Sequence, residues 1–328
     1  MSKAKLNAKL FVAALPAILI STGALAAGET IAVFTKNQTN PYFQTVRVGA
    51  EVAAKSLGAK AVHYIPTKPD SIPEQLSQVE DVIVKKPSAI VFVPVDYKAM
   101  VPGVEQINDA KIPIVNVTDR SAGGKFLAFV GADDYSLGLE TARFLLKEIG
   151  GKGNVVILEG VKGSLTNIDR VRGFNDAIKE FKDVKLLASQ PANYQRLQGL
   201  QVMENLMQSH PQIDGVLAAN DAMAIGVIEA LDGANRKAKV VGINGTKEAV
   251  DAIKAGKLLA SGDYNGFLQG CIGTLVAIRA LRNEPIVTEV VLKPTVVNAS
   301  NFQPYDSPLE SRSCPSWSEA AALASKPN

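Results

Sequence analysis

The sequence predicts an α/β protein of two similar lobes, each a parallel β-sheet flanked by helices. Short apolar runs alternate with longer amphipathic segments from Ile31 to about Val297, which is the pattern of repeated strand–helix–strand units. Continuous apolar runs such as Ile90–Val93 fit strands that are buried on both faces. The chain has 328 residues, enough for about two domains of ordinary size.

The individual elements follow from the same alternation. The expected strands are Ile31–Phe34, Ala61–Tyr64, Ala89–Val93, Pro113–Val117, Phe126–Val130, Asn154–Leu158, Val184–Ala188, Gly215–Ala218, Val240–Ile243 and Leu258–Gly262. The expected helices include Tyr42–Leu57, Ile72–Val84, Leu137–Ile149, Ile168–Phe181, Leu197–Ser209, Ala222–Leu231 and Phe267–Arg282. Ten strands fit two ordinary sheets better than one very wide sheet. The turn-rich stretch Gly131–Tyr135 is the expected break between the lobes.

The first 26 residues have the features of a secretory signal peptide. An apolar run, Leu10–Ile20, follows a lysine-containing start, and Ala24-Leu25-Ala26 matches the small-x-small cleavage pattern. An 11-residue run broken by Pro16 is too short to span a bilayer, which disfavours a membrane anchor. We therefore expect export and cleavage before Ala27, and in a Gram-negative host a soluble periplasmic protein.

Composition and charge exclude several classes of protein. Hydrophobic residues make up 47% of the chain and charged residues 20%, which argues against disorder and collagen-like structure. The chain has 35 basic and 32 acidic residues, and three lysines lie in the signal segment, so the remainder carries 32 of each. An even balance gives no electrostatic bias toward nucleic acid or anionic lipid. Two cysteines and two histidines are too few for a Cys/His zinc cluster, and we expect no metal and no cofactor.

Polar and aromatic side chains follow the strands, at the edge where parallel sheets bind ligands. The residues in question are Lys36, Asn40, Tyr42, Phe43, Asp119, Arg120, Arg170, Tyr194, Asn220, Asn244, Asp263 and Tyr264. Carboxylates and amides match sugar hydroxyls, while aromatic rings cover the C–H faces of a sugar. The alternative is that some of them, such as Asp119, Asn220 and Asn244, are only helix caps.

The motifs formed by these residues resemble those of periplasmic sugar-binding proteins of ABC transporters, in the ribose/allose-binding group with the type I periplasmic-binding fold. The resemblance covers about residues 29–300. Its markers are Thr39-Asn-Pro-Tyr-Phe43, Thr118-Asp-Arg120, Arg170-Val-Arg-Gly-Phe174, Ala188-Ser-Gln-Pro-Ala192, Ala219-Asn-Asp-Ala-Met-Ala224 and Val241-Gly-Ile-Asn-Gly245.

The resemblance implies a hinge that the chain crosses three times, near Ala132, Tyr264 and Lys293. The expected parts are a signal peptide (1–26), an N-terminal lobe (27–132 plus 265–293), a C-terminal lobe (133–264 plus 294–305) and a tail (306–328). Hinge closure around the ligand would be followed by delivery to a permease, and a chemoreceptor is a further expected partner. The expected protein is a monomer without catalytic activity.

The resemblance also assigns roles within the site. Tyr42, Phe43 and Tyr194 would sandwich the sugar ring, and Asp119, Arg120, Arg170 and Asn220 would bind its hydroxyls. Asn244 stands where the family has Asp, Tyr264 where it often has Gln, and Lys36 where ribose binders have a small polar residue. Relative to a ribose-type site, Lys36 and Asn244 together make the local charge more positive by about two units. A neutral monosaccharide or polyol is our main interpretation, and a sugar acid or furanosyl signalling molecule is the alternative.

The sequence disfavours two other classes of protein. A carbohydrate-processing enzyme is disfavoured because the chain lacks a G-x-G-x-x-G turn after the first strand and a G-x-S-x-G elbow. A sugar-responsive transcription factor is disfavoured by the export signal and the missing helix-turn-helix. Cys271 and Cys314 are expected to form a disulfide that holds the tail on the first lobe, the alternative being two thiols.

Overall fold

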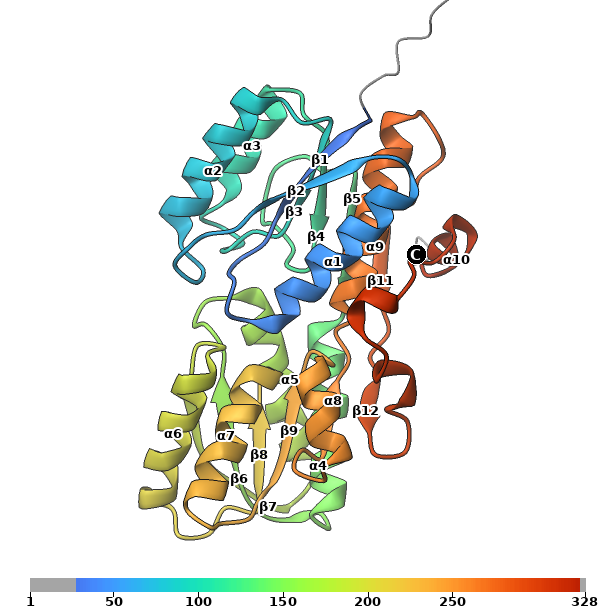
Figure 1. The fold of residues 1–328 in the computed structure, drawn as a ribbon. Coiled ribbons are helices and arrows are strands. Elements are labelled where there is room, and N and C mark those ends of the chain that lie inside the picture. The colour runs from blue at the N-terminus through green and yellow to red at the C-terminus, as the bar shows by residue number, and fades with distance from the viewer. Residues whose placement is uncertain (1–27, 325–328) are drawn as a thin grey trace, which may run out of the picture.

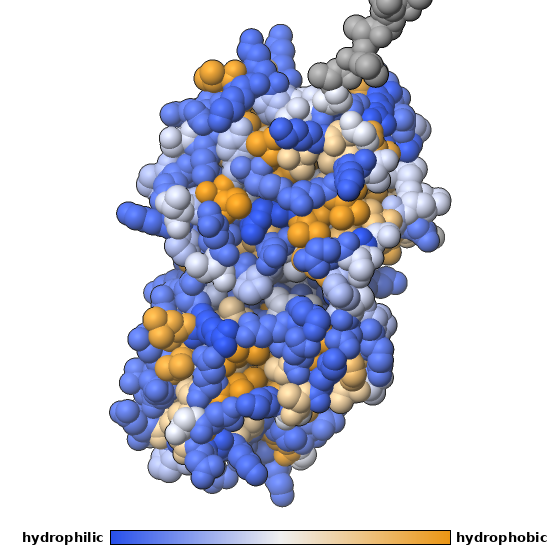
Figure 2. Space-filling model, in the orientation of Figure 1, coloured by the Kyte–Doolittle hydropathy of each residue, from blue (hydrophilic) through white to orange (hydrophobic). Residues whose placement is uncertain are grey.

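The computed structural model describes residues 28–324, and these form two α/β lobes, each built on one six-stranded sheet (Figure 1). The predicted fold class is therefore confirmed. Figure 2 shows two rounded masses of mostly hydrophilic surface that meet at a narrow waist. The expected signal segment and its cleavage site lie outside the described residues.

The sheet of the first lobe has the strand order β11-β5-β4-β3-β1-β2, and all neighbouring pairs are parallel. Its strands are β1 (Thr30–Phe34), β2 (Lys60–Tyr64), β3 (Ala89–Phe92), β4 (Ile114–Val117), β5 (Ala128–Ala132) and β11 (Glu289–Leu292). Its helices are α1 (Pro41–Ser56), α2 (Ile72–Lys85), α3 (Val101–Asp109) and α9 (Gly266–Leu281). Helices α1 and α9 cover one face and α2 and α3 the other, so successive strand residues are buried in two separate apolar cores.

The sheet of the second lobe has the strand order β12-β10-β9-β8-β6-β7. Its strands are β6 (Lys152–Glu159), β7 (Asp183–Pro191), β8 (Gly215–Ala218), β9 (Lys239–Ile243), β10 (Ala260–Gly262) and β12 (Val296–Asn298). Its helices are α4 (Asp134–Glu148), α5 (Leu165–Lys179), α6 (Arg196–Ser209), α7 (Asp221–Gly233) and α8 (Lys247–Lys254). The short edge strand β12 runs antiparallel to β10, whereas the other pairs are parallel.

Helix α1 lies directly against α9, with the two backbones in close contact. A Cβ atom placed on Gly49 would come 2.1 Å from the carbonyl oxygen of Phe267, and one placed on Gly270 would come 2.0 Å from that of Val46. Only glycine fits at both positions. This contact fixes the start of α1, which carries aromatic residues of the candidate site.

The chain passes from one sheet to the other after Ala132, after Gly262 and after Leu292. These passages place the carboxyl ends of the two sets of parallel strands at the waist. Loops that follow strands in both lobes therefore face one another there. No helix of residues 28–324 is long and apolar enough to cross a membrane.

The tail leads from the second lobe back to the first. It contains two short 3₁₀ turns, η1 (Gln303–Tyr305) and η2 (Leu309–Ser311), and one short helix, α10 (Trp317–Ala322). Asp306 forms an ion pair with Lys254 of α8 at 2.8 Å, while Cys314 is disulfide-bonded to Cys271 of α9. The expected cysteine pairing is thus present, and it attaches the tail to the first lobe.

Candidate ligand-binding site

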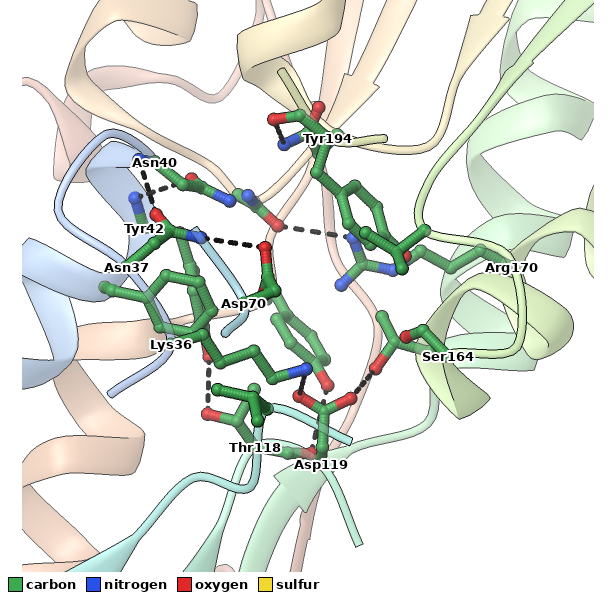
Figure 3. Close-up of a pocket in the computed structure, with 17 residues that line it drawn as sticks. Lys36, Asn37, Asn40, Tyr42, Asp70, Thr118, Asp119, Ser164, Arg170 and Tyr194 are labelled. Atoms are coloured by element: carbon green, nitrogen blue, oxygen red, sulfur yellow. Dashed lines mark hydrogen bonds and ion pairs between the residues drawn. The ribbon is translucent and has the colours of Figure 1, made fainter. Parts of the chain in front are cut away.

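A cavity lies between the lobes at the waist, with about 460 Å³ of space not occupied by protein atoms, part of it open to solvent (Figure 3). The cavity is lined by Lys36, Asn37, Asn40, Tyr42, Phe43, Asp70, Val95, Thr118, Asp119, Val161, Ser164, Thr166, Arg170, Tyr194, Asn220, Asn244 and Tyr264.

The structure brings most of the sequence-predicted residues together around this cavity. Those that line it are Lys36, Asn40, Tyr42, Phe43, Asp119, Arg170, Tyr194, Asn220, Asn244 and Tyr264. These residues come from both lobes and meet at one cavity. Helix capping alone would not bring them together there.

Arg120 is the exception, because its side chain does not line the cavity. Its guanidinium forms an ion pair with Glu289 at 2.5 Å and lies over the ring of Phe129, 3.7 Å from the centroid. The side chain is 48% exposed. A carboxylate and an aromatic face thus hold Arg120 on the outer side of the lobe, although the adjacent Asp119 points into the cavity.

Sequence reasoning missed several residues that line the cavity. These are Asn37, Asp70, Val95, Thr118, Val161, Ser164 and Thr166. Asp70 follows β2, Val95 follows β3, and Val161 to Thr166 follow β6. They lie beyond the carboxyl ends of parallel strands, where ligands bind in such sheets, so their position after a strand is the signal that points to them.

Aromatic rings reach the cavity from both lobes. Asn40 caps α1, accepting a hydrogen bond from the backbone N–H of Tyr42 at 3.1 Å, and so fixes Tyr42 and Phe43 in the first turn. Tyr194 comes from the second lobe, with φ 60°. A Cβ on Gly160 would lie 2.0 Å from the Tyr194 ring, so only glycine permits the ring to take this position.

Arg170 lies at the centre of a buried cluster and is 2% exposed. Its Nε donates to Asp134 Oδ1 at 2.8 Å, and its Nη1 donates to the carbonyl oxygen of Ala219 at 2.7 Å. The guanidinium also lies over the Tyr264 ring, 4.4 Å from the centroid. Burial raises the pKa of Asp134 to about 6, although Arg170 acts in the opposite direction. Asp134, which sequence reasoning also missed, orients Arg170 and partly neutralises it.

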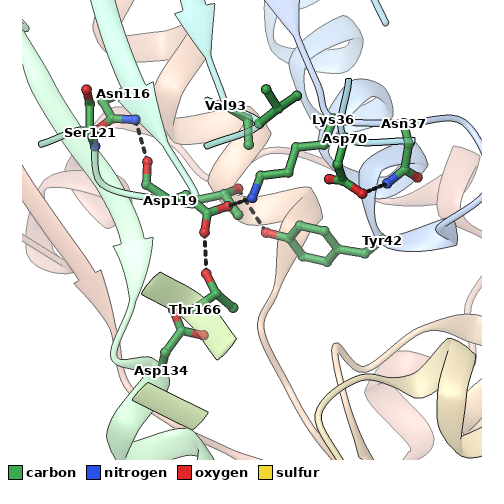
Figure 4. A network of polar contacts seen from close by, with 12 residues as sticks. Lys36, Asn37, Tyr42, Asp70, Val93, Asn116, Asp119, Ser121, Asp134 and Thr166 are labelled. Carbon is green, nitrogen blue, oxygen red and sulfur yellow. Dashed lines mark hydrogen bonds and ion pairs between the residues drawn. The ribbon is translucent and has the colours of Figure 1, made fainter. Parts of the chain in front are cut away.

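Lys36 and Asp119 form a second buried pair (Figure 4). Lys36 Nζ lies 2.7 Å from Asp119 Oδ2, and the other carboxylate oxygen accepts a hydrogen bond from the hydroxyl of Thr166. Because Thr166 belongs to α5 of the second lobe, this bond joins the two lobes directly. The lobes are therefore in a closed arrangement.

Two asparagines combine structural and cavity-lining roles. Asn220 caps α7, accepting from Met223 N at 3.0 Å, and donates from Nδ2 to the carbonyl oxygen of Tyr194 at 3.2 Å. Asn244 has φ 147°, where few non-glycine residues are found, and its side-chain oxygen lies 3.4 Å from Arg170 Nη1. The cap interpretation is thus correct for Asn220 but incomplete, because the same side chain also holds the Tyr194 loop.

The fold and the cavity between its lobes define a two-lobed solute-binding protein. The sequence profile of the periplasmic binding protein domain matches residues 31–285, which is most of the chain. The chain belongs to this family.

Similar proteins agree with this assignment. The chain is 31% identical over 286 residues to the ribose import binding protein RbsB of Haemophilus influenzae, covering 87% of this chain and 97% of the relative. It is 32% identical over 289 residues to the D-allose-binding periplasmic protein of Escherichia coli, covering 85% and 93%. A crystal structure of an ABC transporter periplasmic solute binding protein from Actinobacillus succinogenes with bound D-allose superimposes with a TM-score of 0.80. That protein is 34% identical, over 84% of this chain and 100% of that chain.

Proposed function

We propose that this protein captures a neutral monosaccharide or polyol in the periplasm and delivers it to an ABC permease. The observation that carries the proposal is the cavity, in which hydrogen-bonding side chains and aromatic rings from two lobes face one another. The similarity to ribose- and allose-binding proteins supports the same class of ligand.

A neutral ligand is favoured over a sugar acid by the way the cavity's cations are paired. From the sequence, Lys36 and Asn244 make the site more positive than a ribose-type site, which a sugar acid would explain. In the structure Lys36 is 2.7 Å from Asp119, and Arg170 is 2.8 Å from Asp134. Each cation therefore already has a carboxylate partner, and an anionic ligand would have to compete with it.

Hinge closure is the proposed mechanism of capture. The chain passes between the lobes three times, which allows the lobes to rotate about these connections. A ligand that contacts both lobes binds the closed form better than the open form and shifts the population toward it. The closed form would then present surfaces of both lobes to the permease, or to a chemoreceptor. No chemical conversion of the ligand is part of the proposal.

A ligand screen tests the proposal. The mature protein, starting at Ala27, is tested by thermal shift and calorimetry with D-ribose, D-allose, xylitol, D-ribonate and D-allonate. Ligand at 100 times its Kd stabilises the folded state by about 2.7 kcal/mol, which raises the melting temperature measurably. We expect a shift with at least one neutral compound and recovery of that compound unchanged. If only the acids stabilise the protein, the natural ligand is a sugar acid and the proposal of a neutral ligand is wrong. If the compound is converted to a product, the protein is an enzyme.

A further inference from the structure

Asp70 is the one acidic or basic side chain lining the cavity that takes part in no ion pair among residues 28–324. The other charges cancel locally, since Lys36 is paired with Asp119 and Arg170 with Asp134, just behind the cavity wall. Among these groups Asp70 is therefore the one carboxyl without an ion-pair partner.

The position of Asp70 is fixed by the loop that joins β2 to α2. Its backbone N–H donates to the carbonyl oxygen of Lys36 at 3.1 Å, and its Oδ2 accepts from Asn37 Nδ2 at 3.3 Å (Figure 4). Its Oδ1 has no hydrogen-bond partner within residues 28–324. Burial raises the pKa of this carboxyl, and Lys36 opposes the rise. The free oxygen is available to a ligand.

An uncompensated carboxylate in a partly enclosed cavity discriminates strongly between ligands of different charge. A sugar hydroxyl can donate to it in a charge-assisted hydrogen bond, which is stronger than a bond between neutral groups. A ligand carboxylate at a similar position is repelled, because the Coulomb energy is little screened away from bulk water. Specificity of this kind arises from repulsion of the wrong ligand as much as from attraction of the right one.

We propose that Asp70 determines specificity in this site by accepting a hydroxyl hydrogen of a neutral sugar or polyol and excluding the corresponding sugar acid. The inference rests on the proposed function and deepens it. From the sequence, Lys36 and Asn244 made the site more positive than that of a ribose binder. In the structure Lys36 is paired with Asp119, and the carboxyl of Asp70 makes the cavity unfavourable for an acid.

The substitution Asp70→Asn tests the proposal with little risk to the fold. Asp70 has φ 56°, a left-handed conformation that asparagine tolerates well, and the new amide oxygen can still accept from Asn37. Asp81→Asn is the matched control, because Asp81 is 68% exposed on α2 and its ion pair within residues 28–324 is with Lys85 on the same helix. Calorimetry measures the Kd for D-ribose with D-ribonate and for D-allose with D-allonate. We expect the ratio of the acid's Kd to the neutral sugar's Kd to fall at least tenfold in Asp70→Asn and to stay unchanged in Asp81→Asn.

The outcomes separate this inference from the proposed function. If the wild-type protein binds a neutral sugar and Asp70→Asn leaves the ratio unchanged, the role of Asp70 is refuted while the proposed function stands. If the wild-type protein binds the acid as tightly as the neutral sugar, the site does not exclude the acid, and the role of Asp70 is refuted while the proposed function stands. If it binds none of these four probes or xylitol, the proposed function fails and the inference fails with it.

Discussion

Arg170 has two roles: some of its N–H groups bond to the protein, and the others are available to a ligand. A guanidinium has five N–H donors, and here Nε and Nη1 are engaged by Asp134, Ala219 and Asn244. Its Nη2 has no protein partner in the described part of the chain, so two donors remain for a ligand. The three engaged contacts hold these donors in place before the ligand arrives, which lowers the entropic cost of binding.

Replacing Arg170 by Ala should weaken binding of the best neutral sugar at least 100-fold. A hydrogen bond to a charged group contributes about 1.5–3 kcal/mol, and two such bonds are expected here. Arg120→Ala is the control, since Arg120 pairs with Glu289 outside the cavity and its loss should leave the Kd unchanged. Calorimetry measures both variants, and thermal unfolding checks that each is folded. Equal loss of affinity in the two variants would contradict the placement of both arginines.

At the scale of single residues, the sequence located polar groups but not their partners. Asp119 and Asn220 were predictable because each lies two residues after the end of a strand. The pairing of Arg170 with Asp134 was not, because it depends on how α5 packs against α4. The resemblance placed Arg120 beside Asp119 in the site, but the two neighbouring side chains point in different directions and only Asp119 lines the cavity.

At the scale of elements, helix α7 depends on a residue that also lines the site. Asn220 caps the helix through its oxygen and holds the Tyr194 loop through its nitrogen. Serine is about as good an N-cap as asparagine but lacks the amide donor, whereas alanine lacks both functions. The two substitutions therefore separate the helix cap from the support of the cavity wall.

We expect Asn220→Ala to lower the free energy of unfolding by about 1 kcal/mol and Asn220→Ser to lower it much less. Both variants should bind the sugar at least tenfold more weakly, because the Tyr194 carbonyl loses its donor in each. Urea unfolding gives the stability and calorimetry gives the affinity. Wild-type affinity in Asn220→Ser would show that the amide nitrogen has no part in binding.

Helices and strands with a clear local pattern of apolar residues were predicted most accurately from the sequence. Strand β8 lies where it was expected, because its apolar run is short and sharply bounded. Strand β5 begins two residues later than expected, since its apolar run, starting at Phe126, is longer than the segment that pairs with β4. Helix α8 has only eight residues, and β12 has three and pairs antiparallel, so each is shorter than most of the other helices or strands.

At the scale of the whole molecule, the two lobes are joined by more than the three passages between the sheets. The tail forms a fourth covalent link, because it leaves β12 in the second lobe and is bonded to α9 of the first through Cys271 and Cys314. Near the passage after Gly262, the hydroxyl of Tyr305 donates to Asp263 at 3.1 Å. The alternation of strands and helices predicted the two sheets, but the path of the tail depends on tertiary contacts that leave no local pattern.

The most direct test is a crystal structure of the mature protein with the neutral sugar or polyol that stabilises it most. The account predicts a single ligand enclosed between Tyr42 and Phe43 on one side and Tyr194 on the other. Arg170 Nη2 and Asp70 Oδ1 should each lie within hydrogen-bond distance of a ligand hydroxyl. A ligand held by one lobe alone, or bound away from the waist, would contradict it.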